Sequence, residues 1–208
     1  MKSHRSTPGA TYDNCNKEDI RQALLKEQGH LCAYCMQRIS ASLDNMGIPM
    51  MQIEHYDAQS QHETLRLNYK NMLGVCRGNK GFAKHLQHCD QSRGNQTLKI
   101  DPRDAICENL VKFDNNGEIY SDDAIVDNDL NNFLNLNVRY LVDGRKMAID
   151  EVIKNLNNKY KKKAGQKWSK GDLQKEIKSW QEIDSDGMYQ IYCQAAIHYL
   201  QKKLQRLP

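Results

Sequence analysis

Four cysteines constrain the fold of this chain more than any other feature. The stretch "LCAYC" places Cys32 and Cys35 two residues apart, and Cys76 and Cys89 are the remaining cysteines within reach of that pair. Four thiolates of this kind are the usual ligands of a closed structural zinc site, which holds together loops that lack a sufficient core. We therefore predict one structural zinc ion bound by Cys32, Cys35, Cys76 and Cys89.

The second half of this zinc site leaves alternatives open. Twelve residues separate Cys76 from Cys89, where a second pair two residues apart would be usual. His85 or His88 could replace one of the cysteines as a ligand. His88 precedes Cys89 directly, so its side chain is expected to point elsewhere if Cys89 binds the metal. A further interpretation is that the Cys-x-x-Cys pair is coincidental or redox-active.

Composition and charge permit several classes of partner. The 208 residues are 39% hydrophobic and 27% charged, with a net charge of +4, which is ordinary for a soluble protein with a sizeable core. Nine lysines face two acids over residues 154–178, whereas ten acids face four basic residues over 105–151. The simplest interpretation of each band is a solvated surface. Alternatively, the lysine band guides nucleic acid to a site elsewhere.

The chain shows no signal for a membrane. No segment is apolar for long enough to span a bilayer, and the first residues lack the apolar stretch of a secretory signal. We expect a cytoplasmic protein without membrane contact. Thiols stay reduced in that compartment, so clustered cysteines favour a metal over disulfides.

The predicted fold class is α+β and mostly helical. We expect residues 1–104 to form a module that contains an N-terminal helix and is held together by the zinc site. Residues 105–208 are expected to form a hairpin and a helical region that binds a partner. The final helix is expected to carry Met188, Ile191, Tyr192, Ala195 and Tyr199 on one face. The predicted elements are a helix over 16–29 capped by Asn16 and ended by Gly29, a hairpin over 111–121, a helix over 137–163 that is broken after it, and a helix from about Ser185.

The stretch "MQIEHYDAQ" carries the residues best suited to chemistry. It places Glu54 beside His55, between the two pairs of cysteines. An imidazole titrates near neutral pH and can take a proton from water, and a carboxylate binds hard cations such as Mg²⁺ or Mn²⁺. Asn71 lies five residues before Cys76. It could take part in the chemistry, cap a helix, or do both. Asp90 follows Cys89 directly. Its carboxylate is either a ligand of the hard cation or a solvated group of a loop.

Together these pieces resemble the HNH nuclease motif. The matching elements are Cys32-x-x-Cys35, Glu54-His55, Asn71 to Cys76, and Cys89-Asp90-x-x-Arg93-Gly94. The chain departs from the motif in the twelve residues "RGNKGFAKHLQH" between its last two cysteines, and in having Asp where a His or Asn is usual. With "LKIDPRD", the hairpin and "LNLNVRYLVDGR", the string over about residues 18–147 resembles the PtuB-type nucleases of Septu antiphage systems and retrons.

The resemblance implies a ββα-metal fold and a metal-dependent endonuclease that hydrolyses phosphodiester bonds of nucleic acid. DNA is the favoured substrate, and RNA such as tRNA is the alternative. His55 would be the general base, Glu54 and Asp90 would bind the catalytic Mg²⁺ or Mn²⁺, and Asn71 would hold the loop of His55. Asn95 is the rival to Asp90. The implied partners are an ATPase of the ABC/SMC type and a retron reverse transcriptase with its RNA/DNA product.

Four basic residues near this motif are expected to contact phosphates of the substrate, namely Arg77, Lys80, Lys84 and Arg93. The motif contains no aromatic side chain on which a base could stack. The alternative function is a non-catalytic module, stapled by zinc, that binds nucleic acid or serves as an interaction subunit.

Overall fold

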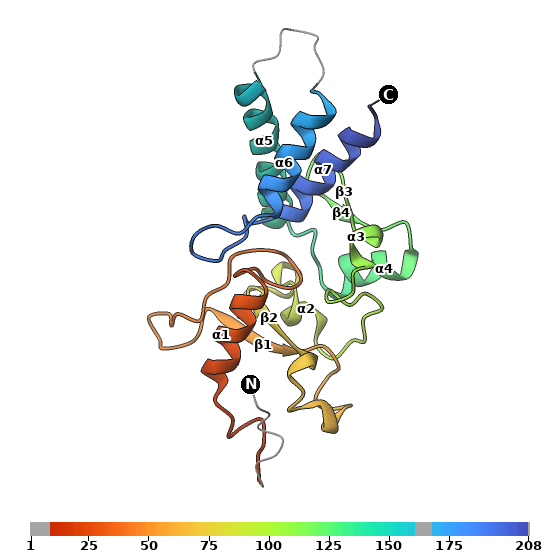
Figure 1. The fold of residues 1–208 in the computed structure, drawn as a ribbon. Coiled ribbons are helices and arrows are strands. Elements are labelled where there is room, and N and C mark those ends of the chain that lie inside the picture. Colours follow the sequence, from red (N-terminus) through yellow and green to blue (C-terminus); the bar gives the residue numbers. More distant parts are fainter. Residues whose placement is uncertain (1–8, 161–167, 208) are drawn as a thin grey trace.

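The computed structural model describes residues 9–160 and 168–207 and confirms an α+β fold in which helices predominate. The cysteine-rich part, with α1, β1, β2 and α2, lies at one end, and α5, α6 and α7 pack together at the other (Figure 1). The helices are α1 (Lys17–Glu27), α2 (Asp90–Arg93), α3 (Cys107–Leu110), α4 (Ala124–Asn128), α5 (Arg139–Tyr160), α6 (Lys170–Gln181) and α7 (Cys193–Gln205). The strands are β1 (Met51–His55), β2 (Met72–Cys76), β3 (Lys112–Phe113) and β4 (Ile119–Tyr120).

Helix α1 and the first hairpin form as the local sequence dictates. The side chain of Asn16 accepts hydrogen bonds from the first free backbone N–H groups of α1, which confirms the predicted cap. Strands β1 and β2 pair antiparallel, with Met51 opposite Cys76 and His55 opposite Met72. This register brings the end of β1 that carries His55 next to the start of β2, and the other end next to a cysteine of the cluster.

The second hairpin also forms as predicted. Phe113 pairs with Ile119 across β3 and β4. The carboxylate of Asp114 accepts hydrogen bonds from the N–H groups of Asn116 and Glu118, and Gly117 adopts a φ of +90°, which glycine tolerates best.

The long helix is confirmed as α5, although residues 161–163 of the prediction lie outside the described residues. Four of the nine lysines of the basic band also lie there, between 161 and 167. Helix α6 was not predicted. Its start carries a capping box, in which the Ser169 hydroxyl and the Asp172 carboxylate each accept a hydrogen bond from the other residue's backbone N–H.

The final helix begins at Cys193, so the predicted start near Ser185 was wrong. The Asp184 carboxylate accepts hydrogen bonds from the N–H groups of Asp186 and Met188, which favours a turn over a helix. Tyr192 then adopts a left-handed conformation with a φ of +57°. Of the predicted stripe, Ile191 is consequently exposed, while Tyr192, Ala195 and Tyr199 are buried.

The segment before α7 packs on the cysteine-rich part, so the two predicted parts share one continuous core. The N–H groups of Tyr189 and Tyr192 donate to the carbonyls of Gly29 and Met36 at 3.0 and 3.2 Å. Gly29 has a φ of +54°, and a Cβ there would lie 2.2 Å from the Tyr189 ring, so only glycine fits. No helix among the described residues has the length and apolar character needed to cross a membrane.

Candidate metal centre and active site

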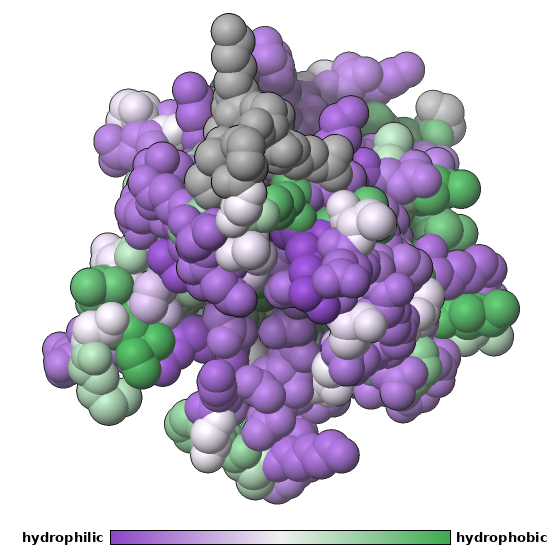
Figure 2. Space-filling view, turned by 90° about the horizontal axis from the view of Figure 1, so that it is seen from below, coloured by the Kyte–Doolittle hydropathy of each residue, from purple (hydrophilic) through white to green (hydrophobic). Residues whose placement is uncertain are grey.

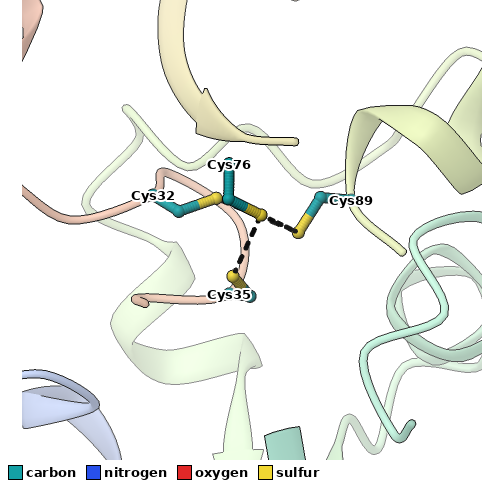
Figure 3. Close-up of side chains that lie close together, drawn as sticks. All are labelled: Cys32, Cys35, Cys76 and Cys89. Carbon is teal, nitrogen blue, oxygen red and sulfur yellow. Dashed lines mark hydrogen bonds between the residues drawn. The ribbon is translucent and has the colours of Figure 1, made fainter. Parts of the chain in front are cut away.

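The four cysteines come from three separate segments. Cys32 and Cys35 lie in a tight loop in which the Cys32 N–H donates to the Gln37 carbonyl and the Met36 N–H donates back to the Cys32 carbonyl. Cys76 ends strand β2, and Cys89 directly precedes helix α2. Their side chains converge on one point (Figure 3). The cluster therefore fastens the loop and the helix to the end of the sheet.

The geometry of the cluster is that of a metal site. The four sulfur atoms lie within 4.8 Å of one another, and three of the distances between them are 3.7, 3.7 and 3.9 Å. All four cysteines are free and buried, and these distances far exceed a disulfide bond of about 2.05 Å. The prediction that these cysteines assemble into a site that could hold a metal is confirmed.

The thiols of the cluster have the electrostatics of a site that could hold a cation. Burial raises the pKa values of the Cys35 and Cys89 thiols well above their usual range. Burial also acts on Cys32, but hydrogen bonds from the other three cysteines hold the pKa of its thiol well below that range. Four sulfurs this close and shut off from water cannot all ionise without a compensating positive charge.

His88 does not point away from the cluster, contrary to the expectation. Its Nδ1 atom lies 3.1 Å from the Cys89 sulfur, and its Nε2 atom forms a hydrogen bond with the Tyr140 hydroxyl of α5. Burial lowers the pKa of His88, which favours the neutral ring. Its Nδ1–H can thus donate to the sulfur, a supporting contact that the sequence did not indicate. His85, the other alternative ligand, is exposed.

Glu54 and Asp90 meet at the end of β1, although they are far apart in the sequence. Their carboxyl groups lie close enough to interact, and ionising both of these neighbouring acids is costly without a compensating positive charge. Burial, and then the hydrogen bond and charge of Asp90, raise the pKa of Glu54 to about 9, and the charge of Arg93 opposes this shift. The backbone of Asp90 is held in place because Asp90 directly follows Cys89 of the cluster. Its rival Asn95 is exposed beyond the end of α2.

Arg93 holds Glu54 in this position and is unavailable to the substrate. Its side chain is 2% exposed, and its Nη1 atom lies 2.6 Å from Glu54 Oε1 and 2.8 Å from the Tyr34 hydroxyl. The rest of the guanidinium donates to the carbonyls of Tyr56 and Gln96. Because Arg93 is buried, it cannot make the expected contact with phosphate. Tyr34 and Tyr56, which come from other segments, help to bury it.

His55 is a buried histidine with both ring nitrogens engaged. Its Nε2 atom lies 2.9 Å from the Arg66 carbonyl, which can only accept, so Nε2 carries the proton. Burial lowers the pKa of His55, while the Arg66 carbonyl opposes this. The lone pair of the neutral ring is thus on Nδ1, where Gln59 donates at 3.0 Å. Tyr12 packs edge-on against the ring, with centroids 4.7 Å apart.

Asn71 fastens the loop that follows His55. Its side chain accepts a hydrogen bond from the Asp57 N–H at 2.8 Å and donates one to the Asp57 carbonyl at 3.0 Å. It is 3% exposed and caps no helix, since Asn68 caps the short turn that Asn71 ends. Asn71 therefore lies where it can position the residues after His55.

The other three predicted phosphate contacts lie on the surface of the inserted segment. Lys80 and Lys84 are exposed. Arg77 is partly exposed, but its guanidinium forms an ion pair of 2.6 Å with Asp44. Of the three, Lys80 and Lys84 have the charges that are more available to a phosphate.

Gln59, Tyr34 and Tyr140 contact the candidate site but were not predicted. Tyr34 stands inside the Cys-x-x-Cys pair, and its hydroxyl donates to Glu54 at 3.4 Å. An aromatic residue between two metal ligands was a visible signal for Tyr34, whereas nothing in the sequence singles out Gln59 or Tyr140.

Comparison of the chain with protein-family models found no match, and comparison with curated proteins found none either.

Proposed function

We propose that this protein is a metal-dependent endonuclease of the HNH type that hydrolyses phosphodiester bonds in nucleic acid. The observation that carries the proposal is the meeting of Glu54 with Asp90 at the end of the strand that also carries His55. An oriented imidazole beside paired carboxylates has the two components that metal-assisted hydrolysis requires, a base for water and a site for a hard cation.

We infer that the cysteine cluster holds zinc. Four sulfurs at 2.3 Å around a tetrahedral zinc ion are about 3.8 Å apart, and the distances between the sulfurs here are 3.7 to 3.9 Å. Zinc in such a closed site would supply stability and no reaction chemistry. Because Cys89 is bonded to Asp90, the cluster would also fix the position of the proposed ligand.

The carboxylate pair fits a hard cation that keeps most of its water ligands. Among the described residues, only the four cysteines bring three or more metal-ligating side chains together, so Glu54 and Asp90 provide two. Mg²⁺ is commonly bound by one or two carboxylates, with water and phosphate completing the shell. When bound, Mg²⁺ or Mn²⁺ would supply positive charge to the phosphate and to the leaving oxygen.

His55 would take the proton from the attacking water at Nδ1. The Arg66 carbonyl fixes the tautomer and leaves the lone pair on that atom. Arg93 and the hydroxyl of Tyr34 hold Glu54, and Asn71 holds the loop after His55. These contacts keep the base and the ligand in place before substrate arrives, which is how enzymes reduce the cost of reorganisation.

A plasmid-nicking assay tests the proposal. Purified protein with intact zinc should nick supercoiled plasmid, or cut tRNA, only when Mg²⁺ or Mn²⁺ is added. Binding of nucleic acid without any cleavage under these conditions would support the alternative, a non-catalytic module stapled by zinc.

The second ligand of the catalytic cation can be identified by substitution. Asp90→Asn should weaken binding of the cation, so that cleavage falls at low Mg²⁺ and partly returns at high Mg²⁺ or with Mn²⁺. Asn95→Ala is the matched control and should cleave normally, because Asn95 is exposed beyond α2. The reverse result, an inactive Asn95→Ala with a normal Asp90→Asn, would show that the inserted residues shift the register of the site.

Gln59 competes with water for His55. The amide of Gln59 donates to Nδ1, the atom that must accept the proton of water. A hydrogen bond of this kind is worth about 1 kcal/mol, so Gln59→Ala should increase cleavage by the isolated protein about fivefold. The rate of nicking measures the effect, and Gln61→Ala, an exposed glutamine in the same loop, is the control. A slower Gln59→Ala would mean that Gln59 supports the base instead.

The role in antiphage defence and the ABC/SMC-type ATPase partner stay predictions that rest on the sequence resemblance. Co-purification of the full chain with an ATPase encoded beside it tests them. We expect an isolated chain to be weakly active, because a nuclease must be restrained in its own host.

A further inference from the structure

An open groove runs beside helix α2, with a volume of about 650 Å³. One wall comes from the inserted segment and carries Lys84 and His85. A second wall comes from the short π-helical turn Asp129–Phe133, which leads toward α5, and carries Asn132 and Phe133. The groove therefore lies where the cysteine-rich part meets the helical part, and neither part forms it alone.

The walls of the groove suit a nucleotide. Lys84 and His85 are exposed, and none of the residues that line the groove is acidic. Within residues 9–160 and 168–207, Lys84 forms no ion pair, so its charge is available for a phosphate. The half-buried ring of Phe133 offers the aromatic surface that the HNH motif itself lacks, and bases stack on such rings. The NH2 group of Asn132 donates to the Asn128 side chain at 2.8 Å, and its amide oxygen offers an acceptor for the edge of a base.

The two walls are fastened to each other. Asn135 donates hydrogen bonds to the carbonyls of His85 and Gln87 at 3.1 and 2.7 Å. The N–H of Cys89 donates to the Leu134 carbonyl at 2.8 Å. Both contacts join the segment of Lys84 to the turn of Phe133, so the groove is formed before any ligand binds.

The groove adjoins the proposed active site through α2. This helix starts with Asp90, and Ser92 and Arg93 from its second half line the groove. Arg93 reaches from the groove to Glu54, so a single side chain separates the two. A strand that lies in the groove would thus lie close to the carboxylate pair, on the other side of the buried Arg93 side chain.

The face of the cysteine-rich end in Figure 2 is mostly hydrophilic, with apolar side chains in small separate groups. Such a surface suits a polar, charged ligand better than an apolar one.

We infer that this groove binds an unpaired nucleotide of the substrate, with its base on Phe133 and its phosphate at Lys84. The inference rests on the proposed function and narrows its substrate to nucleic acid that is single-stranded at the site of cleavage. In a duplex the bases are stacked on each other and cannot stack on a side chain as well.

Binding of a fluorescent 12-nucleotide strand tests the inference. The full chain carrying His55→Ala would be used, so that binding is measured without cleavage. Loss of stacking on one aromatic ring typically costs about 1–3 kcal/mol, so Phe133→Ala should weaken binding of the single strand about 5- to 150-fold. The protein that keeps Phe133 should bind the matched duplex more weakly than it binds the single strand. Lys84→Gln should weaken binding and lower its dependence on salt by about one ion.

Two controls separate the groove from effects on folding. Phe133 packs against the core. Phe133→Leu keeps apolar volume and removes the ring. This variant should fold, and its binding of the single strand should be weakened as in Phe133→Ala. Phe82→Ala removes a phenylalanine that is 63% exposed and does not line the groove, and should bind normally. Zinc content and circular dichroism monitor the fold of each variant.

The results distinguish the groove from the proposed function. If single-strand binding depends on Phe133, for DNA or for RNA, the groove is supported even when the unsubstituted protein cleaves nothing. If Phe133→Ala and Phe133→Leu bind the single strand normally, or if the duplex binds as tightly, the groove is overturned even when the protein is an active nuclease.

Discussion

His55→Ala is expected to keep its metal and its fold and to cleave nucleic acid about a hundred- to ten-thousand-fold more slowly than the unsubstituted protein. The reason is that the Arg66 carbonyl keeps the ring proton on Nε2, so Nδ1 of His55 carries the lone pair that would take a proton from water. Single-turnover rates of cleavage at saturating Mg²⁺ would measure the loss of the base separately from changes in substrate binding.

Two variants control for the burial of His55. His55→Gln can still donate to the Arg66 carbonyl from a flexible amide, so it should fold well while lacking a base. His62→Ala removes an exposed histidine of the following loop and should cleave normally. If His55→Ala were within a few fold of the unsubstituted protein, His55 would have no role in the reaction and another group would have to take the proton.

Cys89→Ser should have the largest effect on stability. Binding of a structural zinc ion contributes on the order of 10 kcal/mol to folding in small modules, and a hydroxyl is a poor substitute for a thiolate. The variant should be insoluble, or should contain far less than one zinc ion per chain by elemental analysis. Because Cys89 lies against the Leu134 carbonyl and precedes Asp90, cleavage should be lost together with the metal.

Cys107→Ser provides the matched control. Cys107 is outside the cluster, and its thiol donates to the Asp101 carbonyl, a bond that a serine hydroxyl can make. This variant should keep its zinc. A soluble Cys89→Ser with full zinc would instead show that His88, whose ring already lies against the Cys89 sulfur, can serve as the fourth ligand.

The cysteine cluster was predictable from the sequence because its information is chemical. Thiols that are clustered in a reduced chain have few uses besides metal binding, so Cys32, Cys35, Cys76 and Cys89 could be assigned without knowing any contact. The caps of α1 and the hairpin of β3 and β4 were predictable for a similar reason. Their signals are local, in Asn16 and in the turn that contains Gly117.

What the sequence could not supply is the set of contacts between distant segments. Arg93 was expected to contact phosphates of the substrate, and its burial follows from Tyr34 and Tyr56, which other segments bring to it. Phe133 is separated by forty residues from Arg93, yet both line the same groove. Helix α6 had a readable signal in Ser169 and Asp172, which the lysine-rich stretch before it obscured.

The contact between Tyr140 and His88 links the two ends of the molecule energetically. Tyr140 belongs to α5, His88 touches the sulfur of Cys89, and Cys89 is bonded to Asp90. If Asp90 is a ligand of the proposed cation, a protein that binds the helical end and shifts α5 would alter how firmly that cation is held. Thermodynamic reciprocity then requires the converse: loading the cation site would change the affinity for that protein by the same factor. If the proposed function is correct, such a partner could sense whether the cation is bound without touching Glu54, Asp90 or His55.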